Sequence, residues 1–267
     1  MNSPVDEQQQ APALIREDRG NAAFLTLNRP RQYNALSEEM IDALQQQLDL
    51  LMHDESIRVV VLAANGKAFC AGHDLKQMRA RPDQSYYREL FERCSRMMLT
   101  LTRIPQPVIA RVQGIATAAG CQLVATCDLA VAAEQARFAV SGINVGLFCS
   151  TPGVALSRNL NRKEAFEMLI TGDFVNADQA RDKGLVNRVV PLDGLDASIR
   201  ELIDSICAKS PVAVRTGKRM FYRQLELGLE QAYEFAGGVM AGNMMAEDAA
   251  EGIDAFMSKR DPIWKGR

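Results

Sequence analysis

The segment from Gly114 to Gly120, Gly-Ile-Ala-Thr-Ala-Ala-Gly, has little side-chain bulk and constrains the fold more than any other stretch of the chain. Apolar runs flank it, at 107–112 and 123–133. If the chain passes from a strand into a helix near Ala118, the first amide groups of that helix have no partner within it, and the helix dipole adds positive potential there. The segment therefore predicts either an oxyanion site or a buried helix end that needs small residues for close packing.

A second segment of small residues lies upstream, at Ala71-Gly72-His73. It follows the apolar run Val59 to Ala64, which predicts a buried strand because it is short, rich in valine and free of charge. A loop at the end of this strand would present the His73 backbone N–H with little bulk on either side. Two convergent backbone N–H groups are what an oxyanion hole requires, so the two segments together favour such a site.

The balance of charge limits the classes of partner. The 267 residues include 31 basic and 33 acidic side chains, and no run of Lys or Arg stands out. We therefore expect neither a nucleic acid nor a membrane as partner, and small molecules or protein neighbours are favoured.

The cysteines and the N-terminal sequence bear on location and metals. The six cysteines lie mostly in apolar stretches and form no Cys-x-x-Cys pair, which is typical of reduced thiols. The first twelve residues contain no apolar run of a secretory signal. The two histidines belong to no cluster with metal-ligand spacing. These features predict a cytoplasmic protein without a bound metal.

Candidate strands and helices alternate along most of the chain. We expect strands at 22–27, 57–63, 108–112, 128–133, 137–140 and 185–190. We expect a helix at 37–51, a polar segment at 79–89 that leads into a helix through residue 103, and mainly helix after residue 152. Short apolar strands separated by helices favour parallel pairing with right-handed crossovers. The length suits one α/β domain with an appended helical piece.

Two motifs identify a family resemblance. Lys67-Ala-Phe-Cys-Ala-Gly-His-Asp-Leu75, followed by Gly114-x-Ala-x-x-x-Gly-x-x-Leu-x-x-x-Cys-Asp128, resembles the enoyl-CoA hydratase/isomerase (crotonase) family. Matches continue through Leu27-Asn-Arg-Pro30, Gly184-Leu-Val186 and Glu251-Gly-Ile253, so the resemblance covers nearly the whole chain from about Ala22. The segment 141–153 and Ala-Gly-His-Asp look most similar to the enoyl-CoA hydratase domain-containing proteins, which lack the family's catalytic glutamate pair.

The resemblance implies a fold and an assembly. The fold is a crotonase-type α/β spiral, in which turns of strand, strand and helix are stacked, followed by a helical region that holds a trimer or a hexamer. On this basis we expect a disordered tail over residues 1–20, the spiral core over 21–200 and the C-terminal oligomerisation region over 201–267. The implied ligand is an acyl-CoA thioester, in which CoA is part of the substrate and no cofactor is permanently bound.

The resemblance also implies the oxyanion donors, namely the backbone N–H groups of His73 and Ala119. They would stabilise a thioester carbonyl as it becomes an enolate. Ala118-Ala119-Gly120 stands where the family usually has three glycines, and the added methyl groups imply a smaller acyl pocket. The His73 imidazole either faces solvent or also touches the acyl group.

The family's two catalytic glutamates align with Gln122 and Gly142 in this sequence. A Gln amide orients water but transfers no proton near pH 7, and Gly has no side chain, so we expect weak or altered hydratase activity. Asn144 and Cys149 lie in the same region as further candidates. The alternative for Cys149 is a small buried side chain, and that for Asn144 and Gln122 is an amide satisfied within the core.

The CoA moiety is implied to lie along residues from two parts of the chain. Arg31, Tyr33, Ala71 and Lys76 would follow the adenosine and pantetheine, while Phe256 and Lys259 would reach the nucleotide end across a subunit boundary. For Arg31 and Lys76 the alternative is an ordinary solvated cation.

Three functions remain open from the sequence. The first is a lyase or isomerase of the enoyl-CoA hydratase family in fatty acid metabolism, the second a non-catalytic acyl-CoA-binding protein, and the third a malonyl-type decarboxylase, in which the leaving carboxylate itself generates the enolate. Phosphate-binding and dinucleotide-binding glycine motifs are absent. A Cys-His hydrolase is disfavoured because the chain has no Gly-x-Ser-x-Gly elbow.

Overall fold

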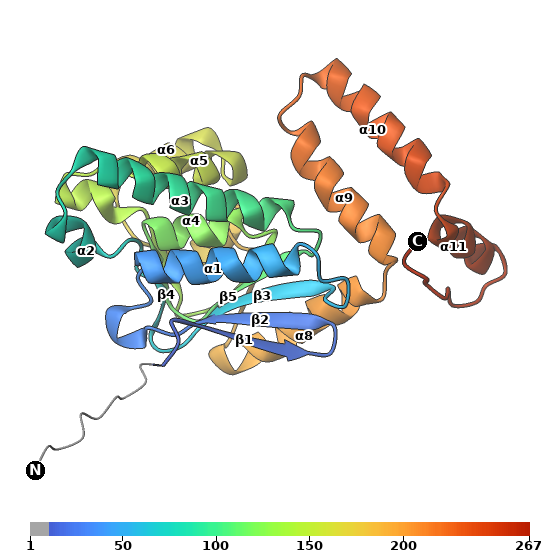
Figure 1. The fold of residues 1–267 in the computed structure, drawn as a ribbon, viewed down its shortest axis with the longest axis horizontal. Coiled ribbons are helices and arrows are strands. Elements are labelled where there is room, and N and C mark those ends of the chain that lie inside the picture. The colour runs from blue at the N-terminus through green and yellow to red at the C-terminus, as the bar shows by residue number, and fades with distance from the viewer. Residues whose placement is uncertain (1–10) are drawn as a thin grey trace, which may run out of the picture.

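The structure is a computed structural model that describes residues 11–267. Its core holds two sheets (Figure 1). The larger sheet has the order β1 (Leu14–Arg19), β2 (Ala22–Leu27), β3 (Val59–Ala64), β5 (Val108–Val112), β7 (Leu129–Ala133), β10 (Arg188–Val190). The smaller one has the order β4 (Ala68–Cys70), β6 (Ile115–Thr117), β8 (Arg137–Ala139), β9 (Val175–Asn176). All neighbours pair in parallel except β1 with β2 and β8 with β9, as expected for strands that alternate with helices.

Each turn of the chain adds one strand to each sheet and then a helix. Strands β3 and β4 are followed by α2 (Leu75–Ala80) and α3 (Gln84–Arg103), β5 and β6 by α4 (Ala119–Thr126), and β7 and β8 by α5 (Ser150–Asn159) and α6 (Arg162–Thr171). This repeat confirms the predicted spiral. Strands β4, β6 and β9 were not predicted, because two or three residues are too few to show a periodicity.

Helices cover both faces of the larger sheet (Figure 1). Helix α1 (Glu38–Leu51) begins after Ser37, whose side chain accepts a hydrogen bond from the Met40 amide, and its apolar face is buried as the sequence predicted. Helix α8 (Leu195–Cys207) covers the other face, where Leu195 and Ile199 pack with valines of the sheet. The strands are therefore apolar on both sides, which is why they read as continuous apolar runs.

Three further helices form an arm that projects from the core (Figure 1). They are α9 (Pro211–Gln224), α10 (Leu229–Met244) and α11 (Glu247–Met257), and a short α7 (Ala177–Asp182) precedes α8. Many large apolar side chains of the arm are exposed, among them Leu229, Tyr233, Met240, Met245 and Phe256. The expected division at residue 200 falls inside α8, which packs on the sheet, so the arm begins after this helix.

The expected disordered tail over residues 1–20 needs a correction. Residues 1–10 lie outside the described part of the chain, but Leu14–Arg19 forms β1, which pairs antiparallel with β2 along its whole length. The strand was missed because four of its six residues are charged. They suit an exposed edge, where Arg16 pairs with Asp18 and Arg19 with Glu17.

Candidate functional site

The two loops expected to hold an oxyanion lie against each other. One follows β4 and the other follows β6, and these strands are parallel neighbours, so their carboxyl ends meet at one edge of the smaller sheet. Gly72 lets the two loops approach closely: a Cβ there would lie 2.9 Å from the Ala118 Cβ and 3.2 Å from the Ala119 amide nitrogen. Its φ of +89° is also one that only glycine adopts readily.

One backbone N–H group on each loop is free within the described part of the chain. Among residues 11–267, neither the His73 N–H nor the Ala119 N–H has a hydrogen-bond acceptor. Ala119 is the first residue of α4, and Gly120 lets this helix start pack onto β4, since a Cβ at 120 would lie 2.0 Å from the Cys70 carbonyl oxygen. The sequence thus puts two unpartnered donors on adjacent loops.

Ala118 holds the turn into α4 in a strained conformation. Its φ is +51° and its ψ is −122°, a region that is essentially restricted to glycine. Its N–H donates to the Ala139 carbonyl and its own carbonyl accepts from Gln122, so both ends of the residue are fixed. The Ala118 methyl group, which replaces a hydrogen of the family's usual glycine, therefore requires a strained backbone.

The strain predicts the effect of Ala118→Gly. We expect this variant to be more stable than the wild type by about 1 kcal/mol, because removal of the strain outweighs the entropy that glycine gains in the unfolded chain. Ala119→Gly is the matched control and should destabilise instead, since Ala119 has ordinary helical geometry. Urea denaturation measures the stability of both variants relative to the wild type. An Ala118→Gly variant less stable than the wild type would contradict the prediction.

The His73 side chain does not face solvent. Both ring nitrogens are buried without a hydrogen-bond partner among the described residues, and the ring meets Phe91 of α3 edge-on with centroids 5.3 Å apart. Burial lowers the pKa of His73, an effect that the nearby Leu36 backbone opposes. The imidazole is therefore neutral at pH 7.

Gln122 lies one turn into α4. Only 5% of the residue is exposed, and its Oε1 is buried without a partner among residues 11–267. Positions three apart share a face of a helix, so Gln122 lies on the same side of α4 as Ala119. The core therefore does not satisfy this amide oxygen, contrary to the alternative that the sequence left open for Gln122.

Gly142 has no room for a side chain. It lies in the 3-10 turn η2 (Ser141–Val145), and a Cβ would stand 2.6 Å from the Leu147 carbonyl oxygen and 2.7 Å from the Cys149 Sγ. Cys149 thus fills the space into which a side chain at 142 would project. Burial raises the pKa of the Cys149 thiol, opposed by the Gly142 backbone, so the group is a protonated thiol at pH 7.

The Asn144 side chain contacts the end of helix α6. It is exposed, and its Nδ2 donates to the Gly172 carbonyl at 3.4 Å, which ties η2 to the end of α6. Ser141, another polar residue of this segment, is paired with Thr117, which the sequence had not singled out: the two hydroxyl oxygens are 2.8 Å apart. Thr117 ends β6 and Ser141 follows β8, and these two strands are neighbours in the smaller sheet. The sequence alone did not predict this pairing.

The residues expected to bind CoA fall into two groups. The Tyr33 carbonyl accepts from the Ala71 N–H at 3.0 Å, which places the 31–33 turn beside the first loop. Arg31 and Lys76 are exposed in this part of the molecule.

Phe256 and Lys259 lie near the end of the arm, across the molecule from α2 (Figure 1). Within one chain the two groups therefore do not meet. Phe256 is 84% exposed, so its side chain is open to a neighbour.

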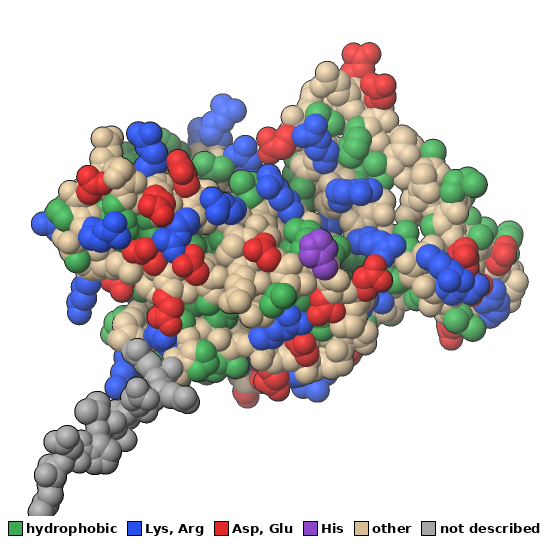
Figure 2. Space-filling view, in the orientation of Figure 1, with side chains coloured by type: hydrophobic (Ala, Val, Ile, Leu, Met, Phe, Trp, Pro, Cys, Tyr) green, Lys and Arg blue, Asp and Glu red, His purple; other side chains and the backbone are tan. Residues whose placement is uncertain are grey.

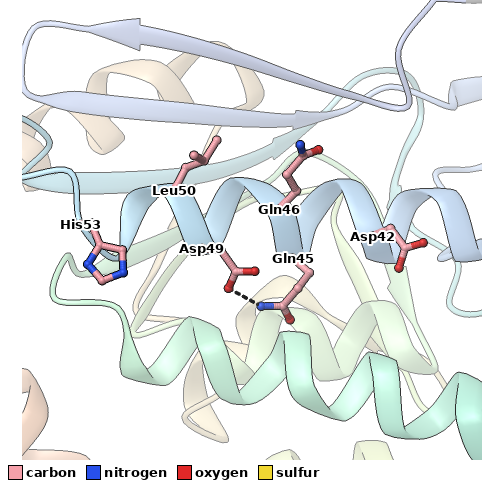
Figure 3. Close-up of a pocket in the computed structure, with 6 residues that line it drawn as sticks. All are labelled: Asp42, Gln45, Gln46, Asp49, Leu50 and His53. Carbon is pink, nitrogen blue, oxygen red and sulfur yellow. Dashed lines mark hydrogen bonds between the residues drawn. The ribbon is translucent and has the colours of Figure 1, made fainter.

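A hollow elsewhere on the surface of the described residues contains none of the expected site residues. In Figure 2, acidic and basic side chains are interspersed on the visible face. The hollow, of about 510 Å³, runs along α1 (Figure 3) and is lined by Asp42, Gln45, Gln46, Asp49, Leu50 and His53. All six come from one helix or its end, and none is an expected site residue.

Comparison with known proteins identifies the family. The model of the enoyl-CoA hydratase/isomerase family matches residues 17–267, and the chain belongs to this family. A crystal structure of an enoyl-CoA hydratase from Mycobacterium smegmatis is 61% identical, with a TM-score of 0.93 over 95% of this chain and 99% of that one.

The expected resemblance to enoyl-CoA hydratase domain-containing proteins is also confirmed. The chain is 43% identical to enoyl-CoA hydratase domain-containing protein 3 of Xenopus laevis, over 96% of this chain and 87% of the relative. The crystal structure of the human protein of that name is 40% identical, with a TM-score of 0.91 over 94% of this chain and 100% of that chain.

The expectation of a cytoplasmic location is contradicted. The relatives from Xenopus laevis, mouse and human are all named as mitochondrial proteins. Charge balance and cysteine content predict a reducing environment, but they do not distinguish between compartments that share it. In residues 11–267, no helix combines the length and the apolar character that crossing a membrane requires.

Proposed function

We propose that this chain binds an acyl-CoA thioester whose carbonyl oxygen accepts hydrogen bonds from the His73 and Ala119 amides. The observation that carries the proposal is the pair of unpartnered N–H groups on adjacent loops, with Gly72 between them. Membership of the enoyl-CoA hydratase/isomerase family supports it. One donor of this kind typically lowers a barrier by about 2.7–4 kcal/mol when charge develops on the oxygen.

The chemistry proposed for this site is lyase or isomerase chemistry with weak hydratase activity. Neither Gln122 nor Gly142 exchanges a proton, and each missing acid or base typically costs a factor of about 10²–10⁴. The neutral His73 and the protonated Cys149 thiol do not replace a carboxylate pair.

A second candidate is decarboxylation of a malonyl-type thioester. Here the bond between the α-carbon and the carboxylate breaks, CO₂ leaves, and the electron pair forms the enolate that the two amides stabilise. This route needs no base, so the absence of carboxylates at positions 122 and 142 favours it. Binding without turnover is the third candidate.

The CoA group is proposed to follow Arg31, Tyr33, Ala71 and Lys76, beside the first loop. Phe256 and Lys259 would reach it only from another subunit, since they lie at the far end of the arm (Figure 1). The exposed apolar side chains of the arm support a trimer or hexamer, because exposed apolar patches of this extent usually mark an interface.

Calorimetry tests the binding proposal. Acetyl-CoA and crotonyl-CoA should bind more tightly than free CoA, because only the thioesters offer a carbonyl to the two amides. If neither thioester shows a heat of binding and neither competes with free CoA, the site is not an acyl-CoA site.

Hydration of crotonyl-CoA tests the chemistry. We expect slow turnover by the wild type and a gain of about 10²-fold for Gln122→Glu, which restores one proton carrier. Gly142→Glu is unsuitable, because its Cβ would collide with the Leu147 carbonyl. Gln46→Glu on the exposed side of α1 is the control and should change nothing. Fast hydration by the wild type, without a gain in Gln122→Glu, would show that other groups transfer the proton.

A further inference from the structure

The segment 65–74, which leads from β3 through β4 to the His73 amide, lies against the turn at 29–36. At the start of the segment, Pro30 packs on Gly66 so closely that a Cβ at 66 would stand 2.6 Å from the Pro30 Cβ. The contact continues along the segment through hydrogen bonds of both backbone and side chain. The turn and the segment therefore form one unit.

The end of this segment explains why the His73 N–H is free. Leu36 forms an isolated parallel bridge with His73. The Leu36 N–H donates to the Gly72 carbonyl at 2.8 Å, and the Leu36 carbonyl accepts from the Asp74 N–H at 3.4 Å. In such a bridge the bonds go to the neighbours of the central residue, so the N–H of the central residue points away from the partner. Leu36 therefore sets the direction of the His73 N–H.

Asn34 joins the turn to the segment through every polar group of its side chain. Its Nδ2 donates to the Asn65 carbonyl at 2.8 Å and to the Ala68 carbonyl at 2.9 Å. Its Oδ1 accepts from the Arg29 N–H at 2.8 Å. A side-chain amide has two N–H donors and one acceptor oxygen, so here both donors hold the segment and the acceptor holds the turn.

The backbone of Asn34 suits the same task. The residue is 0% exposed and has a φ of +54°, a left-handed conformation that asparagine tolerates better than most residues. Ala68 begins the three-residue strand β4, and His73 follows shortly after that strand ends. A fixed Ala68 carbonyl and a fixed Leu36 backbone together determine where the His73 N–H lies.

We propose that Asn34 is a positioning residue for the thioester carbonyl. It acts through the segment 65–74, which it holds so that the His73 and Ala119 amides share one oxygen. The inference rests on the proposed function, because it requires the carbonyl at these two amides. Since Tyr33 belongs to the same turn, the part of the site proposed for CoA and the part proposed for the carbonyl are held as one unit.

Calorimetry compares acetyl-CoA with free CoA, because only the thioester has a carbonyl for the His73 amide. Asn34→Gly keeps the left-handed backbone and removes the side chain. We expect it to reduce the advantage of acetyl-CoA over free CoA by up to about tenfold, the scale of one net hydrogen bond.

Gln106→Ala is the matched control. Gln106 is 4% exposed, and its Nε2 also donates to two backbone carbonyls, those of Leu51 and Asp54 at the end of α1. This variant should lose stability and keep the full advantage of acetyl-CoA.

Hydrogen exchange on the wild type tests the same coupling without a variant. Coupling between two sites is reciprocal, so a carbonyl bound at the His73 amide should stabilise the hydrogen bonds of Asn34. We expect acetyl-CoA to slow exchange of the Asn34 side-chain amide more than free CoA does. This difference between the two ligands should be larger for Asn34 than for the Gln106 side-chain amide.

The outcomes separate this inference from the proposed function. An undiminished advantage of acetyl-CoA in a folded Asn34→Gly, or an equal loss in Gln106→Ala, overturns the positioning role and leaves acyl-CoA binding intact. If Asn34→Gly does not fold, equal protection of the two side-chain amides in the wild type overturns the role. If acetyl-CoA binds the wild type no more tightly than free CoA, the proposed function itself fails.

Discussion

Lys218→Met is expected to destabilise the protein by about 3–5 kcal/mol, because it leaves a carboxylate in the interior without its partner. The Lys218 Nζ lies 2.6 Å from Asp128 Oδ2 and also donates to the Leu101 and Gln106 carbonyls, and the residue is 8% exposed. Tyr222 donates to the other oxygen of Asp128 at 2.8 Å. These contacts join α9 to the core.

Two variants make this measurement specific. Arg219→Met removes a cation from the next position of α9, where the side chain is exposed and makes no ion pair with a described residue, and should change stability by less than about 0.5 kcal/mol. Adding Asp128→Asn to Lys218→Met removes the uncompensated charge and should recover part of the loss. Equal stability of Lys218→Met and wild type in urea denaturation would show that the ion pair is not an anchor.

The same ion pair explains a motif that the sequence left without a role. Asp128 belongs to the Cys-Asp pair that helped to establish the family resemblance. In the structure it accepts from the Val108 amide as well as from Lys218 and Tyr222, so it joins two strands of the larger sheet and the arm. Its partners lie far away in the sequence, and spacing could not have indicated them.

Local patterns predicted the elements that carry a clear periodicity. The apolar face of α1 and the uniform apolar run of β3 are both buried as expected. For these two elements the sequence was informative because each rests on a run of neighbouring residues. The adjacency of the two glycine-containing loops followed instead from the family resemblance, since β4 and β6, which carry the loops, were not predicted.

Other features depend on contacts between distant segments and were not predictable. The collision of a Cβ at Gly142 with Cys149 Sγ depends on how the chain turns back after η2. The burial of the His73 ring depends on Phe91, a residue of α3. The edge strand β1 was hidden by its charges, which suit its exposed position. In each case the determining contact is tertiary.

Gly72→Ala is expected to weaken acetyl-CoA binding by up to about tenfold, the scale of losing one net hydrogen bond to the carbonyl oxygen. The new Cβ would lie 2.9 Å from the Ala118 Cβ and 3.2 Å from the Ala119 nitrogen, so the loops must separate and the two amides no longer share one oxygen. Calorimetry measures the affinity, and thermal unfolding shows whether the variant is folded.

Gly20→Ala separates the steric effect on the loops from backbone strain. Gly20 has a φ of +59°, so alanine is strained there too, but nothing lies within 4 Å of its added Cβ, and it sits in the turn between β1 and β2. We expect this control to lose stability by about 1 kcal/mol and to bind acetyl-CoA as the wild type does. Adding Ala118→Gly to Gly72→Ala removes the shorter of the two contacts and should restore part of the affinity. Unchanged binding by Gly72→Ala, or an equal loss in Gly20→Ala, would place the thioester carbonyl elsewhere.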